Sequence, residues 1–186
     1  NQGEFYTTAL NSYIKFLCMG LLMLIPAISV IFPIMINESY ADAKQLVPYY
    51  LLATIVSCIS SFFGNIFTAI KKNNVLFYTT VAGSVVNVVG VHLLLPIVGV
   101  QGASIALFLG FMVNNTIRAY LLKKEIQVSI DLKFIVAWAI VYIGVSYIYL
   151  HANAIINVLT VFVGGLLTLF VFRKELKEIL GTIKNR

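Results

Sequence analysis

Six long apolar runs dominate this sequence and limit what it can fold into. They are Ile14–Ile36, Leu46–Ile70, Val75–Val98, Gly102–Leu122, Phe134–Leu150 and Ile155–Phe172. A helix needs about 20 apolar residues to cross roughly 30 Å of hydrocarbon, and each run meets or approaches that length. The runs lack sustained period-two alternation and are too long for barrel strands. The sequence therefore predicts an all-α integral membrane protein with about six transmembrane helices.

The composition agrees with this class, since 60% of the 186 residues are hydrophobic and 11% are charged. A soluble domain is about half apolar and about a quarter charged. The net charge of +6 would suggest nucleic acid in a soluble protein, but here the basic residues fall in short segments between apolar runs. We therefore expect membrane lipids rather than nucleic acid as partners. Both cysteines, Cys18 and Cys58, lie inside apolar runs without metal-site spacing, which favours packing.

The basic residues fall almost entirely on one side of the predicted spans. That side holds Lys15, Lys71, Lys72, Arg118, Lys123, Lys124, Lys133, Arg173, Lys174, Lys177, Lys184 and Arg186, and the other holds only Lys44. By the positive-inside rule both termini are cytoplasmic, which six crossings permit. The chain begins with Asn1 and shows no cleavable signal pattern, so we expect a fragment that begins within a longer protein.

Small and amide side chains form stripes along the third and fourth runs. The stripe residues are Gly83, Asn87 and Gly90 in the third run and Gly102, Ala106, Gly110 and Asn114 in the fourth. Because small residues let helix backbones approach closely in lipid, these two helices are expected to pair. The second run carries a polar stripe, which is expected to face protein or water because hydrocarbon cannot satisfy an amide. Its residues are Thr54, Ser57, Ser61, Gly64 or Asn65, and Thr68.

Several local patterns complete the expected topology. Helical spacing upstream of Ile14 predicts that the first helix extends into the cytoplasm, and Pro26 and Pro33 predict a kink in it. The alternating segment Lys123–Lys133 fits a short strand, although a membrane-surface linker is favoured. Only four residues separate the last two runs, which predicts a helical hairpin, and the basic tail 173–186 is typical of an interfacial helix.

Polar groups within the runs are the candidates for function. Arg118 continues the stripe of the fourth run and is either a phosphate-binding group at the inner mouth of a cavity or a topology anchor. Asn65, Asn87 and Asn114 are candidates to bind substrate hydroxyls or an ion, with interhelical hydrogen bonding as the alternative. His92 is either proton-linked or a neutral packing residue hydrogen-bonded to a neighbouring helix. These side chains form no catalytic set.

Catalytic motifs are missing from the sequence. No apolar run contains Asp or Glu, and no zinc-protease, phosphate-loop or Cys/His ligand motif occurs. We therefore expect no enzyme, no metal and no cofactor. If transport is coupled to an ion through a buried carboxylate, that carboxylate is expected outside this segment.

A group of residues surrounds the corner between the third and fourth runs. It comprises Asn87, Leu95-Pro96, Gly99, Gly102-Ala103 and Ala106, preceded by the turn Ala69–Lys72 and by Tyr40, Ala43 and Leu46. This pattern resembles the polysaccharide flippases of the multidrug/oligosaccharidyl-lipid/polysaccharide exporter superfamily and covers Ile14 to about Lys124. The sequence departs from the family pattern at Val100-Gln101 and at Ser104.

The resemblance implies two six-helix lobes around a cavity that opens alternately to each side. This chain would form most of the second lobe of that flippase-type transporter. Residues 1–124 would supply four of its helices, 125–133 a cytoplasmic amphipathic linker, 134–172 a terminal hairpin and 173–186 a basic cytoplasmic tail. The missing N-terminal lobe of the same protein would be its partner.

The resemblance also implies a substrate, an undecaprenyl-diphosphate-linked oligosaccharide such as an O-antigen repeat unit of lipopolysaccharide. The protein would move it across the bacterial cytoplasmic (inner) membrane in polysaccharide biosynthesis, with a polysaccharide polymerase and a chain-length regulator as further partners. Three alternatives remain open: a multidrug exporter of the same superfamily, a non-transporting membrane scaffold, and a membrane polymerase or acyltransferase. An enzyme would need a long outer loop or an acid–histidine cluster, which the sequence lacks.

Overall fold

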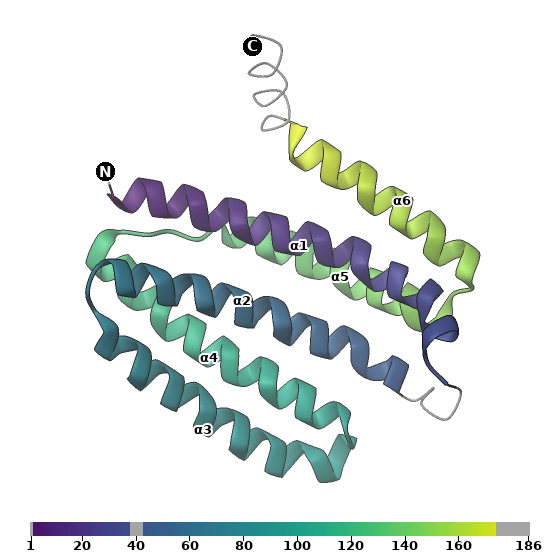
Figure 1. The fold of residues 1–186 in the computed structure, drawn as a ribbon, viewed down its shortest axis with the longest axis horizontal. Coiled ribbons are helices and arrows are strands. Elements are labelled where there is room, and N and C mark those ends of the chain that lie inside the picture. The colour runs from purple at the N-terminus through teal and green to yellow at the C-terminus, as the bar shows by residue number, and fades with distance from the viewer. Residues whose placement is uncertain (1, 38–42, 174–186) are drawn as a thin grey trace.

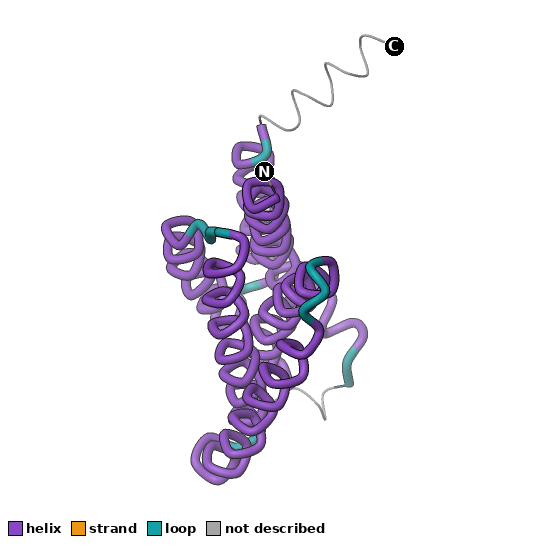
Figure 2. The backbone as a smooth tube through the Cα atoms, turned by 90° about the vertical axis from the view of Figure 1, so that its left-hand side faces the viewer, coloured by secondary structure: helices purple, strands orange, loops and turns teal. Residues whose placement is uncertain are grey.

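The computed structural model describes residues 2–37 and 43–173, which contain helices and loops but no strand (Figures 1 and 2). The helices are α1 (Gln2–Met35), α2 (Val47–Ala69), α3 (Asn73–Val98), α4 (Gln101–Ile126), α5 (Leu132–His151) and α6 (Ala154–Val171). All six are long and apolar enough to cross a membrane. The prediction of six such helices in an all-α protein is confirmed, and apart from the start of α1 their bounds lie within a few residues of the predicted runs.

Helix α1 forms the centre of the hydrophobic core. It begins at Gln2, which confirms the predicted extension upstream of the first apolar run, and it remains one helix through Pro26 and Pro33. One face of α1 is buried against α2 and α5, and its buried residues include Leu10, Ile14, Cys18, Leu22 and Ile25. The apolar face of α1 thus lies between α2 and α5 and joins them in one core (Figure 1).

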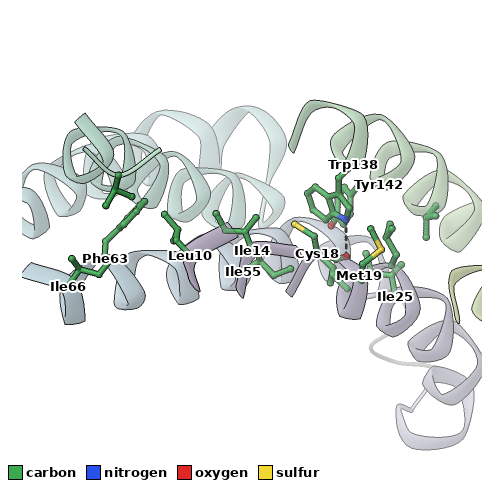
Figure 3. Close-up of a cluster of buried hydrophobic side chains, with 14 of the residues drawn as sticks. Leu10, Ile14, Cys18, Met19, Ile25, Ile55, Phe63, Ile66, Trp138 and Tyr142 are labelled. Atoms are coloured by element: carbon green, nitrogen blue, oxygen red, sulfur yellow. Dashed lines mark hydrogen bonds between the residues drawn. The ribbon is translucent and has the colours of Figure 1, made fainter. Parts of the chain in front are cut away.

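Two aromatic side chains of α5 tie that core to neighbouring backbone (Figure 3). The indole Nε1 of Trp138 donates a hydrogen bond to the carbonyl oxygen of Cys18 at 2.8 Å, and the hydroxyl of Tyr142 donates to the carbonyl oxygen of Pro48. The Cys18 thiol is free and buried in this cluster, as its packing role requires, and Cys58 is free and half-buried. Buried Trp and Tyr side chains need such partners because a polar group left unpaired in an apolar core is costly.

The described loops gather at two ends of the bundle. At one end Lys72, in the α2–α3 turn, pairs with Glu125 at the end of α4 at 2.5 Å, and Gly3 lies against the carbonyl oxygen of Ile126. At the other end the amide of Gln101 donates to the side chain of Gln45 at 2.9 Å. The N-terminus, the α2–α3 turn and the α4–α5 linker therefore share one end, as the placement of the basic residues predicts (Figure 1).

The α4–α5 linker is held by the first turns of α1. The hydroxyl of Thr7 accepts a hydrogen bond from the backbone N–H of Ser129 at 3.1 Å. The Asn11 amide donates to the Ser129 carbonyl at 3.1 Å and accepts from the backbone N–H of Asp131 at 2.9 Å. Val128, one of the alternating apolar residues of the linker, is buried in the helical core rather than in a sheet. The segment forms no strand, because the side chains of α1 supply the partners that a second strand would have given.

Replacing Asn11 should loosen the linker without unfolding the bundle. We expect Asn11→Ala to lower the free energy of unfolding by about 1 kcal/mol, because its two hydrogen bonds to the linker are lost at a partly exposed site. Amide hydrogen exchange at Ser129 and Asp131 should become faster, and the neighbouring Ser12→Ala, on an exposed position of α1, should leave it unchanged. Unchanged exchange in Asn11→Ala would show that Thr7 and Val128 hold the linker without Asn11.

The last two helices pack differently from the predicted hairpin. Both α5 and α6 pack against α1, and they contact each other little. Gly164 of α6 lies against Leu22 and Met23 of α1, and the hydroxyl of Thr168 contacts the sulfur of Met23 at 3.7 Å. The small-residue side of α6 is thus used to approach α1, because a glycine lets the two backbones come close. The predicted interfacial helix within 173–186 and the aromatic position Tyr40 lie outside the described residues, apart from Arg173.

Candidate functional site

Helices α3 and α4 lie against each other along a tight seam of small residues. A Cβ atom added to Gly83 would lie 2.7 Å from the carbonyl oxygen of Gly110, and a Cβ on Gly110 would lie 2.7 Å from that of Gly83. Farther along, Gly90 faces Ala106 in the same way. These distances leave no room for a side chain, so the predicted small-residue stripes do form the contact between the two helices.

Arg118, near the end of this seam that lies towards the α2–α3 turn, is buried and ties α4 to both α2 and α3. Its Nε donates to the hydroxyl of Thr79 at 2.9 Å, and its Nη2 donates to the hydroxyl of Thr80 at 3.0 Å and to the carbonyl of Leu76 at 3.5 Å. Its Nη1 donates to the carbonyl and hydroxyl oxygens of Ser60 at 2.7 and 3.0 Å. Only 5% of the residue is exposed.

All the hydrogen-bond partners of Arg118 in the described chain are neutral. A guanidinium carries five N–H donors. In Arg118 three of the five hydrogen bonds go to side-chain hydroxyls and two go to backbone carbonyls, so all five donors are used. Dipoles therefore stabilise the buried charge, and no described carboxylate lies in salt-bridge contact with it. A ligand phosphate could be bound by a paired contact only if some of these bonds opened. Within the described chain Arg118 therefore acts as a structural residue. We call its set of hydrogen bonds, which joins α2, α3 and α4, the clamp.

A pocket of about 70 Å³, lined by both polar and apolar side chains, lies beside the clamp, between α3 and α4. Thr80, Ser84 and Asn87 line it from α3, and Leu107, Phe111 and Asn114 line it from α4. The amide oxygens of Asn87 and Asn114 are buried and have no hydrogen-bond partner among the described residues. An unpaired buried acceptor costs about 1–3 kcal/mol. The pocket thus brings together two of the candidate residues, Asn87 and Asn114, and Arg118 is joined to its rim through Thr80.

Asn65 and the polar stripe of α2 lie apart from this pocket. Asn65, Thr54, Ser61 and Thr68 are exposed on α2. The three hydroxyls donate to carbonyl oxygens one turn earlier on α2, at 2.9 to 3.2 Å, so they need no other partner. The side chains of Asn65 and Ser57 make no such bond to the described chain, so these two residues of the stripe still require a polar neighbour. The expected polar or protein-facing side of α2 is therefore not covered by the described helices.

His92 has no partner on a neighbouring helix within the described residues. It is exposed on α3, next to Leu95 and Pro96, on a side of the helix that the described bundle leaves open. The expected interhelical hydrogen bond is therefore not formed within residues 2–37 and 43–173. Its position follows from the helical period, which places His92 far around the axis from the seam residue Asn87.

Sequence reasoning missed the hydroxyl groups that satisfy Arg118. Ser60, Thr79 and Thr80 belong to none of the predicted stripes, although each lies two or three turns from the basic turn at Lys71 and Lys72. A buried arginine in an apolar helix requires acceptors at its own depth in adjoining helices. Searching neighbouring spans for hydroxyls at that depth would have found them. Ser84, which lines the pocket, was missed for the same reason.

Comparison of the chain with protein-family models, with curated proteins and with solved structures finds no match.

Proposed function

We propose that this chain is a membrane-spanning lobe of a transporter that moves a lipid-linked oligosaccharide between the two leaflets of a bacterial cytoplasmic membrane. The proposal rests on the family resemblance of the α3–α4 corner and on one structural observation. Inside apolar helices, a cation without a carboxylate partner in the described chain lies beside a pocket with two unpaired amide groups. Intramembrane polar groups are expensive, and their gathering in one place is typical of a substrate path.

The sign of the buried charge distinguishes between the transport substrates. The described acids Glu4, Glu125 and Asp131 lie at helix ends, and no described acid lies within the seam. The charge of Arg118 would repel a cationic drug, because no described carboxylate compensates that charge. The same charge would attract a diphosphate-linked sugar. Amide and hydroxyl groups match the hydroxyls of the sugar. A multidrug exporter is therefore the weaker reading.

A non-transporting scaffold is the second candidate, and Arg118 is the observation that favours it. All hydrogen bonds of the guanidinium go to its own chain, as they would in a purely structural clamp. Reconstitution of the whole protein separates the two functions. An undecaprenyl-diphosphate-linked oligosaccharide would be placed in one leaflet of proteoliposomes. Binding of a lectin would then measure how much of it reaches the opposite leaflet.

Removing the pocket amides should slow transport. We expect the double substitution Asn87→Leu with Asn114→Leu to reduce the translocation rate by about tenfold or more, because apolar isosteres cannot bind sugar hydroxyls. Met112→Leu, on an exposed position of α4, is the control and should translocate at the normal rate. A wild-type protein that inserts but moves no lipid-linked oligosaccharide would support the scaffold instead.

A further inference from the structure

The exposed surface of α2 is polar, although the helix is long and apolar enough to cross a membrane. From Leu51 to Thr68 every exposed residue is polar, and these residues recur at the spacing of one helix face. Helix α6 shows the opposite pattern, because every exposed residue from Ile155 to Phe170 is apolar. The exposed residues of α2 in this range are Thr54, Ser61, Asn65 and Thr68. The two helices therefore suit different surroundings.

Hydrocarbon cannot satisfy the polar stripe of α2. The hydroxyls of Thr54, Ser61 and Thr68 donate to carbonyl oxygens of α2 itself, so these three residues would tolerate lipid. The amide of Asn65 and the hydroxyl of Ser57 have no hydrogen-bond partner in the described chain. An unpaired amide in hydrocarbon is costly, since lipid chains have neither donors nor acceptors. The surroundings of α2 must therefore supply hydrogen bonds.

The same side of α2 covers the buried charge of Arg118. Gly64, which precedes Asn65, is partly exposed, and a Cβ added to it would lie 3.7 Å from Nη1 of Arg118. Whatever borders the stripe at Gly64 is thus close to a guanidinium that has no carboxylate partner in the described chain. Water there would stabilise the charge, whereas hydrocarbon would not. The charge of Arg118 and the amide of Asn65 require the same surroundings.

Water fits the stripe better than a partner helix does. The three hydroxyl donors already bind carbonyl oxygens of α2, so a second protein segment would find few donors to pair with. The stripe also extends over about 20 Å of helix from Thr54 to Thr68, and its unpaired groups lie at different levels. Water donates and accepts at any position, so it needs no matching pattern of partners.

We infer that the polar stripe of α2 borders water within the membrane, whereas the exposed face of α6 borders lipid. This inference rests on the membrane insertion assumed in the proposed function, but it does not rest on transport. Water then reaches α2 at Gly64, in front of the guanidinium of Arg118.

Thr54 and Val163 are exposed positions of similar depth on the two helices. Phe62 of α2 stacks on Tyr13 of α1, and the two helices run in opposite directions (Figure 1). Thr54 therefore lies about two turns beyond Tyr13, near the level of Leu22. Val163 adjoins the glycine of α6 that packs against Leu22. The two positions differ mainly in which face of the bundle they occupy.

Thiol labelling in membranes compares these two positions. In the whole protein with Cys18 and Cys58 replaced by Ala, Thr54→Cys and Val163→Cys are treated with a charged, water-soluble methanethiosulfonate on both sides of the membrane. Because the thiolate is the reactive form and is favoured in water, Thr54→Cys should react about 100-fold faster than Val163→Cys. Ser61→Cys should react within about threefold of Thr54→Cys, and it replaces Thr54→Cys if that variant does not fold. Gel filtration establishes which variants are folded.

Slow labelling at both stripe positions in folded proteins would overturn the inference. A membrane-permeant fluorophore on the same thiols would then be quenched by brominated lipid chains if lipid covers α2, and would escape quenching if another protein segment does. Reaction at Val163→Cys as fast as at Thr54→Cys would overturn it equally, because α6 would have no lipid face.

Transport is a separate readout. Fast labelling of the stripe in a protein that moves no lipid-linked oligosaccharide would uphold the water-facing stripe and refute the transport proposal. Translocation by a protein with an unreactive stripe would do the reverse.

Discussion

Gly83→Ala is expected to cause one of the largest losses of stability available to a single methyl group in this protein. The added Cβ would lie 2.7 Å from the carbonyl oxygen of Gly110 and 3.1 Å from Cβ of Asn114. The first of these atoms belongs to helix backbone and cannot rotate away, so α3 must move from α4 along the seam. We expect the free energy of unfolding to fall by about 2–3 kcal/mol, as for an overpacked core.

The control for this prediction is Gly144→Ala on α5. Nothing lies within 4 Å of a Cβ added to Gly144, which is exposed. That substitution should stabilise the protein by about 0.5–1 kcal/mol, because alanine has the better helix propensity. Both variants would be unfolded with SDS in mixed micelles and the midpoints compared. Equal midpoints for Gly83→Ala and Gly144→Ala would mean that α3 and α4 do not approach as closely as the structure indicates.

Arg118→Lys should be at least as damaging although it conserves the charge. Lysine has three donors on one atom, whereas the guanidinium reaches Ser60, Thr79 and Thr80 on two helices through its planar fork. At least two charge-assisted hydrogen bonds would be lost while the charge remained buried. We expect the free energy of unfolding to fall by about 3 kcal/mol.

The comparison for Arg118→Lys is a second basic position on the same helix. Lys124 is exposed at the end of α4, and Lys124→Gln should change stability by less than about 0.5 kcal/mol. SDS unfolding of both variants gives the measurement. If Arg118→Lys were as stable as the unchanged protein, the clamp between α2, α3 and α4 would not exist, and the guanidinium would again be available for a ligand phosphate.

Much of the fold could be predicted because its signals are local. The length of each apolar run determines a helix, and the basic residues of the loops indicate which loops share an end. The seam between α3 and α4 was also predictable, since a stripe such as Gly102, Ala106 and Gly110 has the period of a helix face. Helix α6 shows the limit of such reasoning. Its short connection to α5 suggested a hairpin, but its small residues pack on α1, which is distant in sequence.

The candidate site could be predicted only in part. Arg118, Asn87 and Asn114 were identifiable as polar residues on a face of small residues, and the structure places all three at or beside one pocket. Asn65 shares their chemistry but not their position. The difference arises from the rotation of each helix about its axis, because Ser60 of α2 points to the clamp while Asn65 points out of the described bundle.

The sequence by itself determined the six helices, their common ends and the pairing of α3 with α4, because chain length, hydrophobicity and helical period are properties of continuous segments. Only the tertiary structure decided what Arg118 does. Its partners come from α2 and α3, and no local pattern specifies which hydroxyls will reach it. The same packing leaves Asn87 and Asn114 unpaired beside it, since touching glycine backbones hold α3 and α4 at a fixed separation.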